Sequence, residues 1–174
     1  MRYSGCERSD DSRRLRTART ATLLLQGGHS AAEIALYYPA KDLMKCYVPQ
    51  TKVGYERGTP LARLQDAFVG AADALYGDGR GFLIVDEETV ERATVEGNAL
   101  VFGDLRFRAL VMPGVKTVSA AAMANLRRFR EAGGVLIDTE RVGDLLEALE
   151  SRVERDFRFR CAGKNPIRLA HRRH

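Results

Sequence analysis

Short apolar runs alternate with longer segments of helical periodicity along most of the chain. The runs end at a proline, a glycine or an acid, as buried strands do, and cover 33–38, 82–85, 109–112 and 135–137. The longer segments carry apolar residues three and four positions apart and predict helices over 11–26, 59–77, 119–132 and 141–154. Strands this short and apolar on both faces are typical of a parallel sheet covered by helices, so the pattern predicts an α/β protein.

The segment from Arg108 to Thr139 shows this pattern most completely. Two apolar runs enclose a helix that Ser119 can cap and that Gly133-Gly134 can end in a left-handed turn. The predicted apolar face of that helix consists of Ala122, Met123, Leu126 and Phe129. The segment is therefore predicted to be a βαβ unit with a right-handed crossover.

The segments between these strands and helices predict a short helical turn, a β-hairpin and an irregular connection. Thr89–Ala93 predicts one helical turn, and 94–107 has a Gly97-Asn98 turn between apolar alternations, which predicts a β-hairpin. Residues 40–58 lack clean periodicity, so we expect a long irregular connection there. Long connections in compact domains are often binding loops or surfaces for another domain.

The order of the elements predicts a three-layer α/β sandwich, with a mainly parallel sheet and a β-hairpin insertion. With the four strands numbered along the chain, we expect the flavodoxin-like sheet order 2-1-3-4. We expect three parts in the chain: a disordered basic tail over 1–11, the α/β domain over 12–156, and a C-terminal extension over 157–174 in which Pro166 begins another strand.

The net charge of +5 could suggest a nucleic-acid partner, but its distribution argues against one. Half of the 28 Lys and Arg residues lie in 1–20 and 152–174, and the stretch between them holds 14 basic and 18 acidic residues. A nucleic-acid binder more usually has a basic face on an ordered element. There is no apolar run long enough for a membrane span, and no apolar stretch follows the charged N-terminus as in a signal peptide. We therefore expect a cytoplasmic protein.

The sequence offers no motif for a metal or a cofactor. Cys6, Cys46 and Cys161 are far apart and in no CxxC pair, which favours free thiols over a zinc site or a disulfide framework. The three histidines form no paired-ligand spacing. There is neither a GxGxxG nor a Walker motif, so flavin, dinucleotide and nucleotide are not expected.

In a doubly wound sheet the ligand crevice lies outside the carboxyl ends of the strands. The residues predicted at that crevice are Tyr38, Asp86, Glu87, Met112, Gly114 and Asp138. The acids admit a second interpretation, because carboxylates at a strand end and on the following helical turn are commonly helix caps and solvated charge. The turn after 109–112 has no Cys, Ser or neighbouring His, so it does not predict a nucleophile of the kind that class I glutamine amidotransferases hold there.

Five segments in series resemble the α/β domain, class I glutamine amidotransferase-like, that follows the catalytic barrel in large bacterial glycoside hydrolases. They are 23–39, 82–103, 108–119, 126–137 and 167–173. The nearest resemblance is to the α-L-rhamnosidase type, family 106, and a similar domain in family 42 β-galactosidases supports oligomer formation. In such enzymes the barrel carries the catalytic acids, and no position here matches one.

The resemblance implies a non-catalytic accessory domain that is one internal piece of a larger hydrolase, with carbohydrate reached through the parent enzyme. Its partners would be the barrel, with 40–58 as a candidate contact, or a second copy of the chain. The segment 167–173 resembles the first strand of a following β-rich domain. The alternative is a free-standing module that binds a small molecule or a sugar in the crevice.

Overall fold

The computed structural model describes residues 29–49, 57–155 and 172–173. The chain divides into two compact units, Ala31–His171 and a smaller one that joins Met1–Ser30 to Arg172–His174. In the smaller unit, β1 (His29–Ser30) pairs antiparallel with β9 (Arg172–Arg173). The tail predicted over 1–11, the helix predicted over 11–26 and most of the extension predicted over 157–174 lie outside the described residues, so the domain boundaries stay a prediction.

The larger unit is built on a four-stranded parallel sheet. Its strands are β2 (Ile34–Tyr37), β3 (Phe82–Val85), β7 (Ala109–Val111) and β8 (Val135–Ile137). They lie in the order β3-β2-β7-β8, with Ala35 paired to Leu83 on one side and to Leu110 on the other. The predicted α/β class, the four strands and the order 2-1-3-4 are confirmed.

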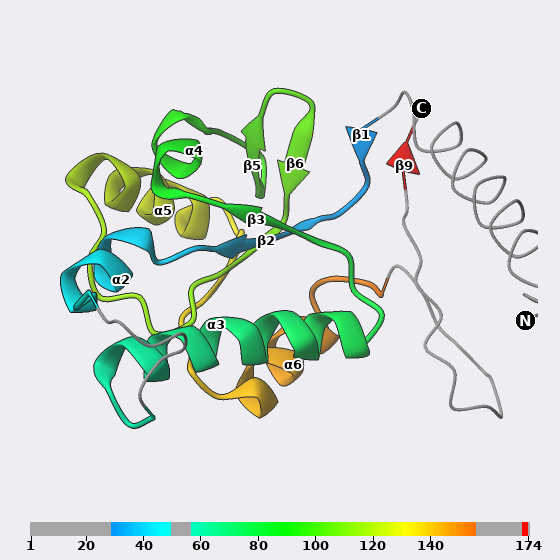
Figure 1. The fold of residues 1–174 in the computed structure, drawn as a ribbon. Coiled ribbons are helices and arrows are strands. Elements are labelled where there is room, and N and C mark those ends of the chain that lie inside the picture. Colours follow the sequence, from blue (N-terminus) through cyan, green and yellow to red (C-terminus); the bar gives the residue numbers. More distant parts are fainter. Residues whose placement is uncertain (1–28, 50–56, 156–171, 174) are drawn as a thin grey trace, which may run out of the picture. The chain divides into compact units, whose positions relative to one another are not determined.

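Helices cover both faces of this sheet, as Figure 1 shows. On one face lie α3 (Pro60–Gly77) and α6 (Val142–Glu150), and on the other α4 (Glu87–Arg92) and α5 (Ala120–Glu131). Successive side chains of a strand point to opposite faces. Ile34 and Leu36 therefore join the core under α3 and α6, while Ala35 and Tyr37 join the core under α4 and α5.

A small antiparallel sheet lies with α4 and α5 on their side of the main sheet (Figure 1). Its strands are β4 (Thr94–Glu96), β5 (Ala99–Phe102) and β6 (Leu105–Phe107). Gly97 and Gly103 occupy its two turns with φ of +57° and +58°, a conformation that a residue with a Cβ rarely adopts. The predicted hairpin is confirmed, and β6 extends it to three strands.

Side-chain caps set the starts of three helices. The Thr59 hydroxyl accepts a hydrogen bond from the Ala62 N–H at 3.2 Å, and Ser119 caps α5 through the Ala122 N–H at 3.1 Å. Asp86 caps α4 in the same way, which begins that helix two residues before the predicted turn at Thr89. These caps satisfy N–H groups that have no partner within the helix.

The predicted apolar face of α5 is correct except at Met123. Ala122, Leu126 and Phe129 are buried, whereas the Met123 side chain is exposed and Asn125 is buried in its place. The Asn125 amide donates hydrogen bonds to carbonyl oxygens of Val90, Glu91 and Ala93 at 2.9–3.1 Å. The end of α4 packs against this position of α5, and its carbonyls need a donor there.

One further helix, α2 (Ala40–Cys46), replaces the first part of the irregular connection predicted over 40–58. It has seven residues and no side-chain cap at its start, and only Asp42 and Leu43 are buried. So short a helix with a single buried apolar residue shows no periodic pattern in the sequence. Its stability comes from tertiary contacts rather than from helix propensity.

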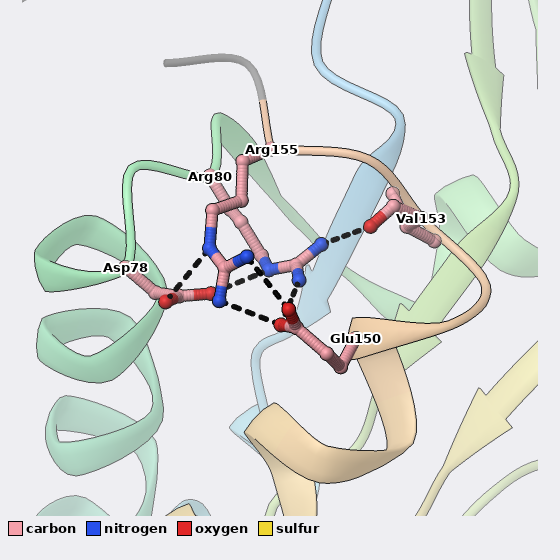
Figure 2. Close-up of polar contacts among 5 residues, drawn as sticks. All are labelled: Asp78, Arg80, Glu150, Val153 and Arg155. Atoms are coloured by element: carbon pink, nitrogen blue, oxygen red, sulfur yellow. Dashed lines mark hydrogen bonds and ion pairs between the residues drawn. The ribbon is translucent and has the colours of Figure 1, made fainter. Parts of the chain in front are cut away.

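A buried arginine joins α3 to α6 near the amino end of β3 (Figure 2). The Arg80 side chain is 1% exposed, and its Nε donates to Asp78 at 2.8 Å. Its other nitrogens contact the Val153 carbonyl oxygen and, at 3.3 Å, the Glu150 carboxylate. Arg155 pairs with the same two carboxylates. Every charge in this network therefore has an opposite partner, which burial of Arg80 requires.

Candidate functional site

A pocket of about 460 Å³ lies beyond the carboxyl ends of the central strands. Four segments contribute to it: α2, the start of α3, the loop after β7 and the loop after β8. The residues that line it are Asp42, Lys45, Cys46, Pro60, Arg63, Leu64, Gly114, Lys116 and Glu140. The sheet order reverses between β2 and β7, and α2 and the Gly114 loop follow these two strands. The pocket thus occupies the place where doubly wound sheets bind ligands.

From one side, α2 holds the loop that follows β7. The Asp42 carboxylate is buried and accepts hydrogen bonds from the backbone N–H groups of Lys116 and Thr117 at 2.7 and 2.9 Å. The Lys45 ammonium donates to the Thr117 hydroxyl at 2.8 Å. Burial alone would raise the pKa of Asp42, but these hydrogen bonds outweigh it and lower that pKa. Asp42 is therefore a charged brace for the loop.

From the other side, α4 holds the end of the same loop. Glu87 accepts a hydrogen bond from the Ser119 N–H at 2.5 Å and forms an ion pair with Lys41. The Ser119 hydroxyl donates to Glu91. Burial opposes ionisation of Glu87, yet Lys41 and Ser119 outweigh it and lower the pKa of this carboxyl. Glu87 is therefore a charged link between α2, α4 and the start of α5.

Asp86 acts as a helix cap, which was the second interpretation of the acids. Its carboxylate accepts from the Thr89 N–H at 2.9 Å and from the Thr89 hydroxyl at 2.7 Å. These hydrogen bonds lower the pKa of Asp86. Tyr37 lies beneath this acidic edge, and burial, with the charges of Glu87 and other acids, raises its pKa to about 12. Its phenol is neutral at neutral pH.

The six residues predicted at the crevice do not gather in one place. Gly114 lines the pocket, whereas Asp86 and Glu87 belong to the contacts of α4. Tyr38 packs edge-to-face on Phe68 of α3, with ring centroids 5.2 Å apart. Met112 is buried, and Asp138 lies at the end of β8 with part of its surface exposed.

Sequence reasoning did not single out the charged residues of the pocket, Asp42, Lys45, Arg63, Lys116 and Glu140. The only signal for part of this set was the unpatterned segment 40–58, proposed as a binding loop, which contains Asp42, Lys45 and Cys46. The other residues come from separate segments that the fold brings together. No local pattern in the sequence marks them.

Asp138 is the acid at this edge whose charge the fold opposes. Partial burial of its carboxyl and the nearby charge of Glu140 raise its pKa. A raised folded-state pKa means that the cost of ionising Asp138 is absent below the unfolded-state pKa of about 3.9 and fully present above the folded-state pKa. We expect Asp138→Asn to raise the urea midpoint at pH 7 and to leave it nearly unchanged at pH 3.5.

Glu140→Gln is the matched variant, because it removes the second cause of the shift. Asp138→Asn should stabilise less in that background than in the wild-type chain. A urea midpoint that falls at pH 7 on Asp138→Asn substitution would show that the ionised carboxylate makes a favourable interaction instead.

Across 29–49 and 57–155, no three His, Cys, Asp or Glu side chains come close enough together to hold a metal ion. No helix in the same ranges is both long and apolar enough to cross a membrane. Compared with models of protein families and with curated proteins, the sequence has no match. The function must therefore be argued from the residues of this edge.

Proposed function

We propose that this chain is a non-catalytic accessory domain of a glycoside hydrolase of the α-L-rhamnosidase type, with a flavodoxin-like, class I glutamine amidotransferase-like fold. The resemblance of the five sequence segments suggests the family. The observation that carries the non-catalytic role is the engagement of Asp42, Asp86 and Glu87 at the carboxyl edge of the sheet. Each accepts hydrogen bonds that hold a helix end or a loop.

Glycoside hydrolysis needs two carboxyl groups that face a substrate across the bond to be broken. One of them must be protonated near the working pH, so its pKa is raised. The pKa values of Asp42, Asp86 and Glu87 are all lowered instead. The pKa of Asp138 is raised, but Asp138 does not line the pocket. Their hydrogen bonds and ion pairs stabilise the charged form, which suits a structural role.

The end of α2 and the two residues after it support a contact with another domain. Met44, Tyr47 and Val48 are exposed by 78%, 60% and 67% and follow one another at spacings of three and one. Clustered exposed apolar side chains favour an interaction surface over a solvated one. They lie in the segment that the resemblance marks as a domain contact, so we assign this surface to the catalytic barrel of the parent enzyme.

The chain by itself is expected to hydrolyse neither p-nitrophenyl α-L-rhamnoside nor p-nitrophenyl β-galactoside above the buffer rate. The physical reason is that Asp42, Asp86 and Glu87 are held in structural contacts and carry lowered pKa values. The rate of hydrolysis is measured from the absorbance of released p-nitrophenol, at the pH at which the protein is most stable.

Turnover lost on Asp86→Asn or Glu87→Gln substitution, but kept in the matched control Asp73→Asn on the exposed side of α3, would contradict the non-catalytic role. The reading frames beside the gene test the family part separately. An in-frame barrel upstream and a β-rich domain downstream would support it, and unrelated frames on both sides would contradict it.

The alternative is a free-standing module that binds a small molecule or a sugar. The observation that favours it is the pocket at the switch point of the sheet, because its volume and its position both suit a ligand. The alternative and the accessory role differ in one measurable property, which is binding of a small ligand by the isolated chain.

A further inference from the structure

The walls of the pocket are rich in positive charge. Lys45 of α2, Arg63 of α3 and Lys116 of the loop after β7 contribute a cation each. Pro60, the first residue of the 18-residue helix α3, also lines the pocket. The N-terminal end of a helix carries a partial positive charge, which adds to the attraction for an anion.

Two of these cations have no partner in the part of the chain that the structure describes. Lys45 donates to the Thr117 hydroxyl, but the side chains of Arg63 and Lys116 make no hydrogen bond or ion pair there. Both side chains are exposed at the mouth of the pocket. They are therefore free to bind an anionic group, and the Arg63 guanidinium can hold a carboxylate or a phosphate through two parallel hydrogen bonds.

The two acids of the pocket differ in their capacity to accept a hydrogen bond from a ligand. Asp42 already receives hydrogen bonds from two backbone N–H groups. Glu140 has no partner among the described residues and lies close to Gly114, where a Cβ would come within 2.9 Å of its carboxylate oxygen. Glu140 can accept a hydrogen bond from a hydroxyl group of a ligand. The pocket thus combines an anion-binding pair with one acceptor.

We propose that this pocket binds a small hydroxylated molecule with one anionic group, such as a sugar acid or a sugar phosphate. Arg63 and Lys116 hold the carboxylate or phosphate, and Glu140 accepts from a hydroxyl. This inference rests on the alternative function, the small-molecule module, and adds to it the charge of the ligand. The volume of about 460 Å³ exceeds what inorganic phosphate alone fills, which favours a larger ligand.

Calorimetric titration of the full chain tests the proposal with four probes: D-glucuronate, glucose 6-phosphate, inorganic phosphate and D-glucose. We expect one or both anionic sugars to bind, more tightly than inorganic phosphate, and glucose not to bind. The Kd should rise with salt, because ions screen the attraction between exposed charges. Comparison of glucuronate with glucose 6-phosphate decides between carboxylate and phosphate.

Arg63→Gln and Lys116→Gln should each raise the Kd of the bound sugar about tenfold, since each removes a hydrogen bond to a charged group. Arg127→Gln is the matched control, because Arg127 is exposed on α5 and does not line the pocket. Far-UV circular dichroism and the urea midpoint of each variant show whether it is folded. Both substituted positions are exposed, so the fold should be kept.

Cys46 supplies an independent readout of the site. It lines the pocket and is a half-buried residue with a free thiol. In a Cys6→Ser, Cys161→Ser background, it is the one remaining thiol. A saturating concentration of the bound sugar should slow its reaction with a thiol reagent severalfold, whereas glucose should leave the rate unchanged.

The outcomes separate the proposal from the function on which it rests. Binding of glucose with the same affinity as the anions overturns the charge assignment and keeps the small-molecule module. Absence of binding by all four probes overturns both and leaves the accessory role. Anion binding that Arg63→Gln and Lys116→Gln do not weaken, or that leaves Cys46 unprotected, overturns this pocket as the site.

Discussion

Replacement of Phe129 by alanine is expected to lower the free energy of unfolding by about 3–5 kcal/mol, the usual cost of deleting a buried aromatic side chain. Phe129 is completely buried on α5 and packs in the core between that helix and the sheet. Its loss leaves a cavity that the surrounding side chains only partly fill. Urea unfolding followed by far-UV circular dichroism measures the change, since the chain has no tryptophan for fluorescence.

Met123→Ala on the same helix is the control, and we expect it to change stability by less than about 0.5 kcal/mol, because Met123 is 38% exposed. If Phe129→Ala fails to fold, Phe129→Leu keeps much of the apolar volume and allows the comparison. A loss for the Phe129 variant no larger than that for Met123→Ala would contradict the packing of α5 on the sheet.

A substitution at Gly134 tests the same packing, because Gly134 lies against the Phe129 ring. A Cβ at Gly134 would lie 2.1 Å from Cε2 of Phe129, whereas Gly133 beside it has φ of +88° and serves the helix end. Gly134→Ala should therefore destabilise the wild-type chain but cost much less when residue 129 is alanine. Additive effects in this double-mutant cycle would show that the two residues do not share the space.

Asp78→Asn is expected to cost about 2–3 kcal/mol at neutral pH. The substitution keeps the size of the side chain but removes the nearest counter-charge of Arg80 (Figure 2). The Arg80 side chain is 1% exposed. Loss of one partner of a fully buried pair costs roughly 3–5 kcal/mol. The expected effect is smaller because the Glu150 carboxylate remains 3.3 Å from Arg80 and is partly exposed.

The effect of Asp78→Asn should depend on pH. Burial opposes ionisation of Asp78, but hydrogen bonds from Arg80 and Arg155 outweigh it and lower its pKa. A group with a lowered folded-state pKa contributes stability above its unfolded-state pKa and loses that contribution as pH falls through the folded-state value. The difference between wild type and variant should be constant at pH 5–8 and shrink progressively below pH 4.

Two variants provide controls for the network. Arg155→Gln should destabilise less than Asp78→Asn, because Asp78 keeps Arg80 as its partner. Asp73→Asn, on α3 and exposed, should have little effect at any pH. If Asp78→Asn lowered the urea midpoint at pH 7 no more than Asp73→Asn does, burial of the charged Arg80 side chain would not depend on the Asp78 carboxylate.

The sequence by itself determined the elements whose signals are local. Apolar runs bounded by turn residues placed the four parallel strands along the chain. Thr59 and Ser119 marked helix starts, because a hydroxyl at a helix start accepts from an N–H three residues ahead. Gly97 marked the hairpin, since its turn needs a positive φ. Each of these features depends on residues close together in the chain.

Only the tertiary structure decided the features made by residues far apart. The Asp42 carboxylate meets N–H groups 74 and 75 residues away, and Arg80 meets Glu150 70 residues away. The helix α2, the burial of Asn125 and the charged walls of the pocket depend in the same way on which segments the fold brings together. A charged residue has the same appearance in the sequence whether its partner is water, a distant backbone or a ligand, so the pocket could be located only once the chain was folded.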